Sequence, residues 1–245
     1  MRNLCRLISL LLLPSTLTVA VSAAAEPLTS AKASFVAMLW NQSSSAALPE
    51  KGLPVDLYYK NGSDYVPLKY RVCQLGEPQG YNGPNPMPIY RKMSALDGQP
   101  QYRPIMDCQI PQASQQFIIF IVAEQGGLRS IAVDASPQHI PDGDVMLINL
   151  TSRQMAAELR GSQQMLQPSQ SMIFKIPKSD TPNLPVKIAT WDSGAWKMIY
   201  STSTRIADDR PYIGILYLNE GRRENYRLRF FRNLNLLRNT STQES

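Results

Sequence analysis

Two aspartates, Asp142 and Asp144, lie two residues apart in the sequence Pro-Asp-Gly-Asp. Alternating carboxylates in a glycine-containing turn are one way in which proteins arrange calcium ligands. A complete calcium loop needs further oxygen donors and a closing glutamate, and the apolar residues 145–150 that follow supply none. Because Pro-Asp-Gly is also ordinary turn chemistry, we expect a tight turn here, with Asn149 closing the next turn on its own backbone.

Catalysis through an activated nucleophile needs a base beside it, and His139 is the only histidine of the chain. It lies in a proline-rich connector, and no Gly-x-Ser-x-Gly elbow is present. Sugar hydrolysis needs two carboxylates that are paired in space. The acidic residues that come into question sit singly at strand edges or turns, where solvation explains them: Asp134, Glu158, Asp192 and Glu220. We therefore predict no catalytic residues and a protein that is not an enzyme.

Cofactor sites are not indicated either. Cys5 lies within the first 25 residues, which we expect to be cleaved. The two isolated cysteines that remain and the one histidine lack the four-ligand spacing of a zinc site, so no metal is predicted. No phosphate-binding P-loop and no Gly-x-Gly-x-x-Gly motif is present, so no nucleotide cofactor is expected.

Cys73 and Cys108 have 34 residues between them. An even pair of cysteines in an exported protein usually forms a disulfide, which we predict here. A bridge closing a loop of this size would stabilise the fold by roughly 3–4 kcal/mol in the chain-entropy model. Two buried free thiols remain the alternative.

Aromatic and basic residues give two further candidates. Trp191 and Trp196 bracket Asp-Ser-Gly-Ala and should stand at either side of a hairpin. If their rings are exposed they could stack on sugar rings, whereas aromatic residues of a sandwich more often lie in the core. Alternation near the C-terminus places Arg227 and Arg229 on one face of a strand. The arginines of a possible binding strip for anionic polysaccharide or carboxylates are Arg222, Arg223, Arg227, Arg229 and Arg232. The alternative, which we favour, is a solvated strand whose charges discourage edge pairing.

Residues 1–25 have the features of a signal peptide. Arg2 and Arg6 flank a short basic region, residues 7–21 are apolar, and small residues precede the cleavage expected after Ala25, or else after Ala23. Without them, 23 basic and 19 acidic residues remain, a formal charge of +4 (23 − 19). This falls short of the basic footprint of a nucleic-acid binder. We expect an exported protein of the periplasm, cell surface or medium, with no membrane span after cleavage.

Short β-prone runs separated by proline, glycine and asparagine make up the first half. Asn61-Gly62 between two alternating runs predicts a hairpin. Residues 76–88 hold so many glycines and prolines that we expect a long surface loop. Residues 115–124 are almost continuously apolar, which predicts a central strand buried on both faces.

Residues 137–144 mark the best domain boundary, because two prolines and a glycine interrupt any element there. Seven β-prone runs follow at intervals of roughly ten residues, a spacing typical of β-sandwiches. The runs at 145–150 and 154–161 are expected to pair as the first hairpin. We read 153–160 as strand, although it could form two helical turns. The predicted units are 28–138 and 139–238, with a disordered tail at 239–245.

The second half resembles a group of uncharacterised exported bacterial β-sandwich proteins. The resemblance rests on a proline-glycine turn, a strand ending in asparagine, a proline-containing turn, a tryptophan strand and an arginine-containing return, with matching positions at Gly143, Asn149, Pro168, Trp196 and Arg210. It implies a sandwich domain outside the inner membrane and no catalytic residue. In size and charge the chain is also similar to periplasmic pilus-assembly chaperones, although their basic anchor pair is not found.

Together these observations predict an all-β protein of two immunoglobulin-like or related β-sandwich domains in tandem. The predicted function is non-catalytic binding or a structural role in the cell envelope or extracellular space. The partner would be an envelope protein or a polysaccharide, while the oligomeric state stays open. The alternatives are a chaperone-like factor that donates a strand and a carbohydrate-active hydrolase.

Overall fold

The computed structural model describes residues 29–40, 56–94, 99–112, 114–124, 127–207, 209–219 and 225–231. Within these ranges the regular structure is strand, which confirms the all-β class. No helix of the described part is long and apolar enough to cross a membrane. The predicted signal peptide and tail lie outside the described residues, as do Arg222, Arg223, Arg232 and Glu220.

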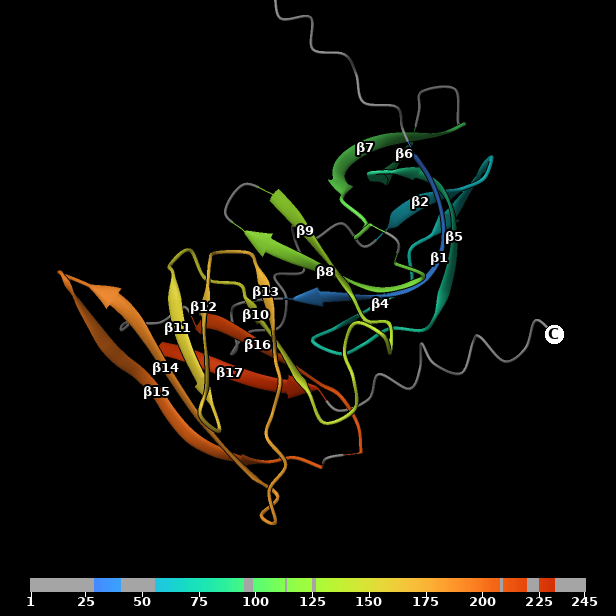
Figure 1. Ribbon diagram of the computed structural model, residues 1–245. Helices are drawn as coiled ribbons and strands as arrows, with labels where there is room; N and C mark the ends of the chain where they lie inside the picture. Colours follow the sequence, from blue (N-terminus) through green and yellow to red (C-terminus); the bar gives the residue numbers. More distant parts are fainter. Residues whose placement is uncertain are drawn as a thin grey trace, which may run out of the picture.

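The first half of the chain forms two sheets (Figure 1). Sheet A holds β4 (Tyr70–Val72), β1 (Thr29–Trp40), β8 (Gln116–Glu124) and β9 (Gly127–Asp134) in that order, and β5 (Gln79–Asn85) also pairs with β1. Sheet B has the order β3 (Asp64–Pro67), β2 (Leu57–Asn61), β6 (Met87–Ser94) and β7 (Pro100–Cys108).

The second half forms two more sheets. Sheet C has the order β13 (Ser171–Phe174), β10 (Val145–Asn149), β16 (Tyr212–Asn219) and β17 (Asn225–Phe231). Sheet D has the order β12 (Ser162–Leu166), β11 (Met155–Leu159), β14 (Asn183–Asp192) and β15 (Ala195–Arg205).

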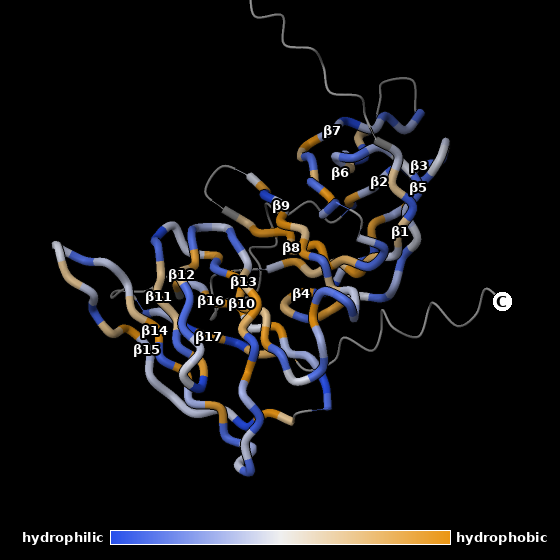
Figure 2. The backbone as a smooth tube through the Cα atoms, viewed as in Figure 1, coloured by the Kyte–Doolittle hydropathy of each residue, from blue (hydrophilic) through white to orange (hydrophobic). Residues whose placement is uncertain are grey.

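Three hydrophobic cores stack these sheets in the order B, A, C, D. Successive side chains of a strand point to opposite faces, so β1 sends Phe35 and Ala37 into the core shared with sheet B, and Val36 and Met38 into the core shared with sheet C. The side chains of β10 alternate in the same way: Met146 and Ile148 enter the core shared with sheet A, and Val145 and Leu147 enter the core shared with sheet D. Figure 2 shows β8 and β10 coloured largely as hydrophobic, as inner sheets of a stack require. Sheets B and D are therefore the outermost layers, each with one face to solvent.

The two halves repeat one pairing scheme. When β4 is left out of the count, each half has eight described strands in chain order. The first strand runs parallel to the seventh, as β1 pairs with β8 and β10 with β16, and antiparallel to the fourth, as β1 pairs with β5 and β10 with β13. The second and third strands form a hairpin, the second also pairs with the fifth, and the fifth and sixth form a hairpin with one register shift. The last two strands form a hairpin in both halves. Strand β4 is the one described strand outside this scheme.

Several sequence expectations are confirmed by the pairing. The Asn61-Gly62 hairpin joins β2 and β3, with Gly62 at φ +61°. Strand β8 lies between β1 and β9 and is buried on both faces. The segment read as strand against a possible helix is β11.

The expected first hairpin of the second half is wrong, because β10 belongs to sheet C and β11 to sheet D. The chain changes sheet at residues 150–154, where the buried Asn149 side chain holds the turn: its Oδ1 accepts hydrogen bonds from Thr151 N at 3.0 Å and Oγ1 at 2.7 Å, and its Nδ2 donates to Arg153 O at 2.8 Å. Asn149 closes this turn by bonding to nearby backbone groups, as expected, but the turn connects sheet C to sheet D instead of joining two strands of one sheet.

The expected loop at 76–88 is also wrong, since most of it is strand β5. This strand forms a ladder only with β1. Its one proline, Pro84, is two residues from Asn82, whose N–H and C=O point away from β1 to Asn61 and Gly62, so Pro84 removes no hydrogen bond of that ladder. Tyr81 is buried in the core between sheets A and B, and its hydroxyl donates to Pro84 O at 2.6 Å. A Cβ at Gly83 would lie 2.7 Å from the Tyr81 hydroxyl oxygen and 2.9 Å from its ring, so the strand requires glycine there.

The predicted Cys73–Cys108 bridge is absent, because both cysteines are free. Cys108 is buried in the core between sheets A and B, whereas Cys73 packs against the core between sheets A and C. The two thiols therefore contact different cores. Burial raises the pKa of the Cys108 thiol to about 12, so it remains protonated at neutral pH.

Candidate functional site

The polar residues singled out from the sequence lie in separate places. Asp142 and Gly143 form the expected turn, where Gly143 (φ +85°) donates its N–H to Arg210 O at 3.1 Å. Asp144 Oδ1 accepts the N–H of Ile176 at 3.2 Å, which ties this turn to the segment after β13. No group of three or more residues that could hold a metal is found in the described part of the chain.

His139 lines a hollow of about 570 Å³ between β9 and the start of β13, together with Asp134, Arg129 and Ser169. Asp134 Oδ1 accepts the N–H of Ser136 at 2.8 Å, and Arg129 donates to Ser169 Oγ at 2.8 Å. The first bond lies within the first half of the chain and the second links the two halves, so the visible roles of these side chains are structural.

Arg227 and Arg229 are exposed on β17, an edge strand of sheet C, and alternate with the buried or half-buried Tyr226, Leu228 and Phe230. The Arg229 guanidinium lies 5.2 Å from the ring centre of Phe231. Of the five arginines of the possible strip, only these two are described, and a binding role for them stays a prediction.

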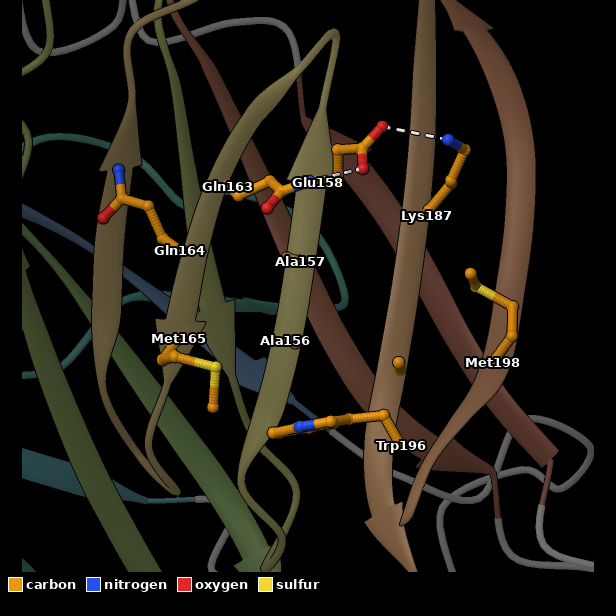
Figure 3. Close-up of a pocket in the computed structure, with 10 residues that line it drawn as sticks. Ala156, Ala157, Glu158, Gln163, Gln164, Met165, Lys187, Trp196 and Met198 are labelled. Carbon is orange, nitrogen blue, oxygen red and sulfur yellow. Dashed lines mark hydrogen bonds and ion pairs between the residues drawn. The ribbon is translucent and has the colours of Figure 1, made fainter.

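The strongest candidate for a binding site is a hollow of about 370 Å³ on the solvent-facing side of sheet D (Figure 3). Pairing brings four residues into one row across the sheet, with Met165 opposite Ala156, Ala156 opposite Ala189, and Ala189 opposite Met198. The two alanines, on the central strands β11 and β14, form a low floor. The two methionines form its walls and are 41% and 54% exposed. A row of long, small, small and long side chains therefore leaves a trough.

A register shift in the β14–β15 hairpin sets the second wall. Ile188 lies opposite Tyr200, but Ala189 lies opposite Met198, so Ile199 is an extra residue. Such bulges re-aim the side chains that follow them. Here Tyr200 packs against the core while Met198 and Trp196 face solvent.

Trp196 closes one end of the trough, and its ring extends across the strands in Figure 3. It lies directly opposite Trp191 in the hairpin, with ring centres 5.3 Å apart and planes at 70°. The hairpin position of this pair was predicted, but both rings are exposed (50% for Trp191, 44% for Trp196), against the expectation of a core position. Only Trp196 lines the hollow.

The opposite end of the trough is polar. Lys187 Nζ lies 3.0 Å from Glu158 Oε1, and Gln163 Nε2 donates to Glu158 Oε2 at 2.9 Å. The Lys187 bond and then the Gln163 bond hold the pKa of the Glu158 carboxyl below its usual range. The carboxylate is therefore charged at neutral pH and already satisfied, an arrangement suited to orienting a ligand rather than to acid catalysis.

The trough offers apolar contact with one polar edge, the composition of most small binding sites. Thioether and indole groups adapt to an apolar guest, whereas hydroxyl-rich ligands need several free donors and acceptors. Sequence reasoning found Trp196 but missed the methionines and the alanine floor. The available signal was a small residue at the outward position of two neighbouring strands, Ala156 and Ala189.

Compared with known proteins, the chain matches no protein-family model and no curated protein.

Proposed function

We propose that this chain is an exported, non-catalytic binding protein of two tandem β-sandwich units, which holds a partner protein of the envelope or extracellular space on the outer face of sheet D. Export is supported by the signal-peptide features of residues 1–25. The tandem arrangement is supported by the repeated pairing scheme and the separate cores of sheets A with B and C with D.

The observation that carries the binding role is the gathering of exposed Met165, Trp196 and Met198 around a hollow floor. A solvated sheet face usually carries polar side chains opposite its apolar inner face. Large exposed apolar groups that adjoin one another mark interaction sites. Their thioether and indole chemistry fits apolar side chains of a protein better than a sugar, because the polar groups beside them already satisfy one another.

The test is site-specific photo-crosslinking in intact cells of the native organism. A photoreactive phenylalanine analogue replaces Gln163, on the rim of the hollow, in a C-terminally tagged chain. The matched control carries the analogue at Ser203, which is exposed on the same sheet opposite Pro185 and does not line the hollow. We expect a discrete protein adduct in the envelope fraction or medium from the Gln163 position only.

A second variant ties the adduct to the hollow. Ala189→Tyr fills the floor, and Ser203→Tyr adds the same side chain elsewhere on the sheet. The Gln163 adduct should be lost with the first and kept with the second. An adduct that survives Ala189→Tyr, equal adducts from both positions, or a polysaccharide adduct would contradict the proposal.

A further inference from the structure

The repeated pairing scheme lets the outer face of sheet B be compared with that of sheet D position by position. The register shift of the β6–β7 hairpin falls between Ile89 and Tyr90, and that of the β14–β15 hairpin between Ile188 and Ala189. Tyr90 therefore corresponds to Ala189. Tyr58 lies opposite Tyr90 as Ala156 lies opposite Ala189, so Tyr58 corresponds to Ala156.

The neighbouring positions correspond in the same way. Lys92, two residues after Tyr90, lies opposite Tyr102, and Trp191, two residues after Ala189, lies opposite Trp196. Tyr102 therefore corresponds to Trp196. Both faces thus carry an aromatic ring at one end. They differ in the centre, where sheet B has two tyrosines and sheet D has two alanines.

In sheet B these tyrosines occupy the space that is hollow in sheet D. The Tyr58 ring packs edge-on against Tyr102, with ring centres 5.1 Å apart and planes at 69°. Tyr90 packs edge-on against Tyr65 at 5.0 Å, and Tyr65 stacks on Tyr102 at 4.0 Å. The chain itself therefore shows which group fits this sheet surface: an aromatic ring over the central strand positions, edge-on to the ring at the end.

We infer that the hollow of sheet D accepts an aromatic side chain of the partner protein, in the place that Tyr58 and Tyr90 fill in sheet B. This rests on the function proposed above. The ring lies over Ala156 and Ala189 and packs edge-on against Trp196, as Tyr58 does against Tyr102. Met165 and Met198 contact it from both sides, a favourable pairing of sulfur and ring.

The experiment uses the mature protein, its methionine methyl groups labelled with ¹³C, and three probes: N-acetyl-L-tyrosinamide, N-acetyl-L-leucinamide and a chitin tetrasaccharide. Single Met→Leu variants assign the methyl signals of Met165 and Met198. The tyrosine probe is expected to shift both signals saturably, because the ring current of the bound ring acts on the methyl groups beside it. The leucine probe and the saccharide should leave them unchanged.

Two variants supply the structural control. Ala189→Tyr introduces the tyrosine that sheet B has at the corresponding position. The ring of this tyrosine should shift the Met198 methyl signal without probe and abolish the response to the tyrosine probe. Ser203→Tyr should leave both the spectrum at these methyls and the response unchanged.

The outcomes separate the inference from the function on which it rests. An equal response to the leucine and tyrosine probes overturns the aromatic specificity while the Gln163 crosslink still supports a partner protein. A response to the saccharide alone overturns both. No response to any probe, together with a crosslink that Ala189→Tyr abolishes, overturns the inference and leaves the binding face in place.

Discussion

Replacing Trp196 by alanine provides a quantitative test of the binding face, because Trp191 offers a matched control. The two rings lie opposite each other in the same hairpin and are similarly exposed, but only Trp196 lines the hollow. Each substitution removes the same ring–ring contact. The free energy of unfolding should therefore fall by a similar amount in both variants, with about 1 kcal/mol from the lost aromatic pair.

Binding of the partner should separate the two variants. A tryptophan side chain presents about 200 Å² when fully exposed, and 44% of Trp196 remains accessible in the free protein. Covering about 90 Å² of apolar surface contributes about 2 kcal/mol at 25 cal/mol per Å². Trp196→Ala should therefore raise the dissociation constant by about thirtyfold. Trp191→Ala should change it little, because that ring lies outside the hollow.

Titration calorimetry with the protein identified by the Gln163 crosslink measures both dissociation constants, and urea unfolding measures both stabilities. Equal losses of affinity in the two variants, or a larger loss for Trp191→Ala, would refute the assignment of the hollow as the binding site. A much larger loss of stability for Trp196→Ala would show that its ring serves the fold.

Three further predictions concern the fold. Asn149→Ala should lower the free energy of unfolding by about 3 kcal/mol in a urea titration, because it removes the side-chain partner of several buried or half-buried backbone groups. A loss below about 1 kcal/mol would contradict this role. Gly83→Ala should cost about 1–3 kcal/mol, since its methyl group meets the buried Tyr81 ring, while Gly80→Ala, with open space around it, should cost less; equal costs would contradict the β5 assignment. Thiol titration of the denatured mature protein should find both remaining cysteines reduced, and its melting temperature should not change with dithiothreitol, whereas a mass lower by two hydrogens would show a bridge.

Local sequence signals predicted most of the strands, but not β5 or β12, and they did not predict which strands pair. Asn61-Gly62 specifies its hairpin because the turn itself fixes the pairing. The segments that became β10 and β11 show the same short apolar pattern as any hairpin, so nothing local distinguishes pairing within one sheet from passage between two. The difference lies in the Asn149 side chain, which binds backbone groups far along the chain at Leu166 and Gln167.

Composition misled in two other places. Glycine and proline at 76–88 usually interrupt structure, yet β5 tolerates them because only one of its edges is paired. The pair of cysteines left after the expected cleavage suggested a bridge, but whether Cys73 and Cys108 meet depends on which core each one enters. That is decided by the face of sheet A on which each side chain packs, a property of the whole fold.

The candidate site was hidden from the sequence for a related reason. Ala156 and Ala189 become a floor only because β11 and β14 are neighbours, and Met198 becomes a wall only because Ile199 is a bulge. Alternation assigns inner and outer positions within a strand, but it does not show which outer face remains uncovered in a stack of four sheets. The solvent face of an outermost sheet is not needed to build the cores, so its residues are free to differ between the halves. Tyrosines close this face in sheet B and alanines open it in sheet D, and it is this difference on a shared framework that identifies sheet D as the face with room for a partner.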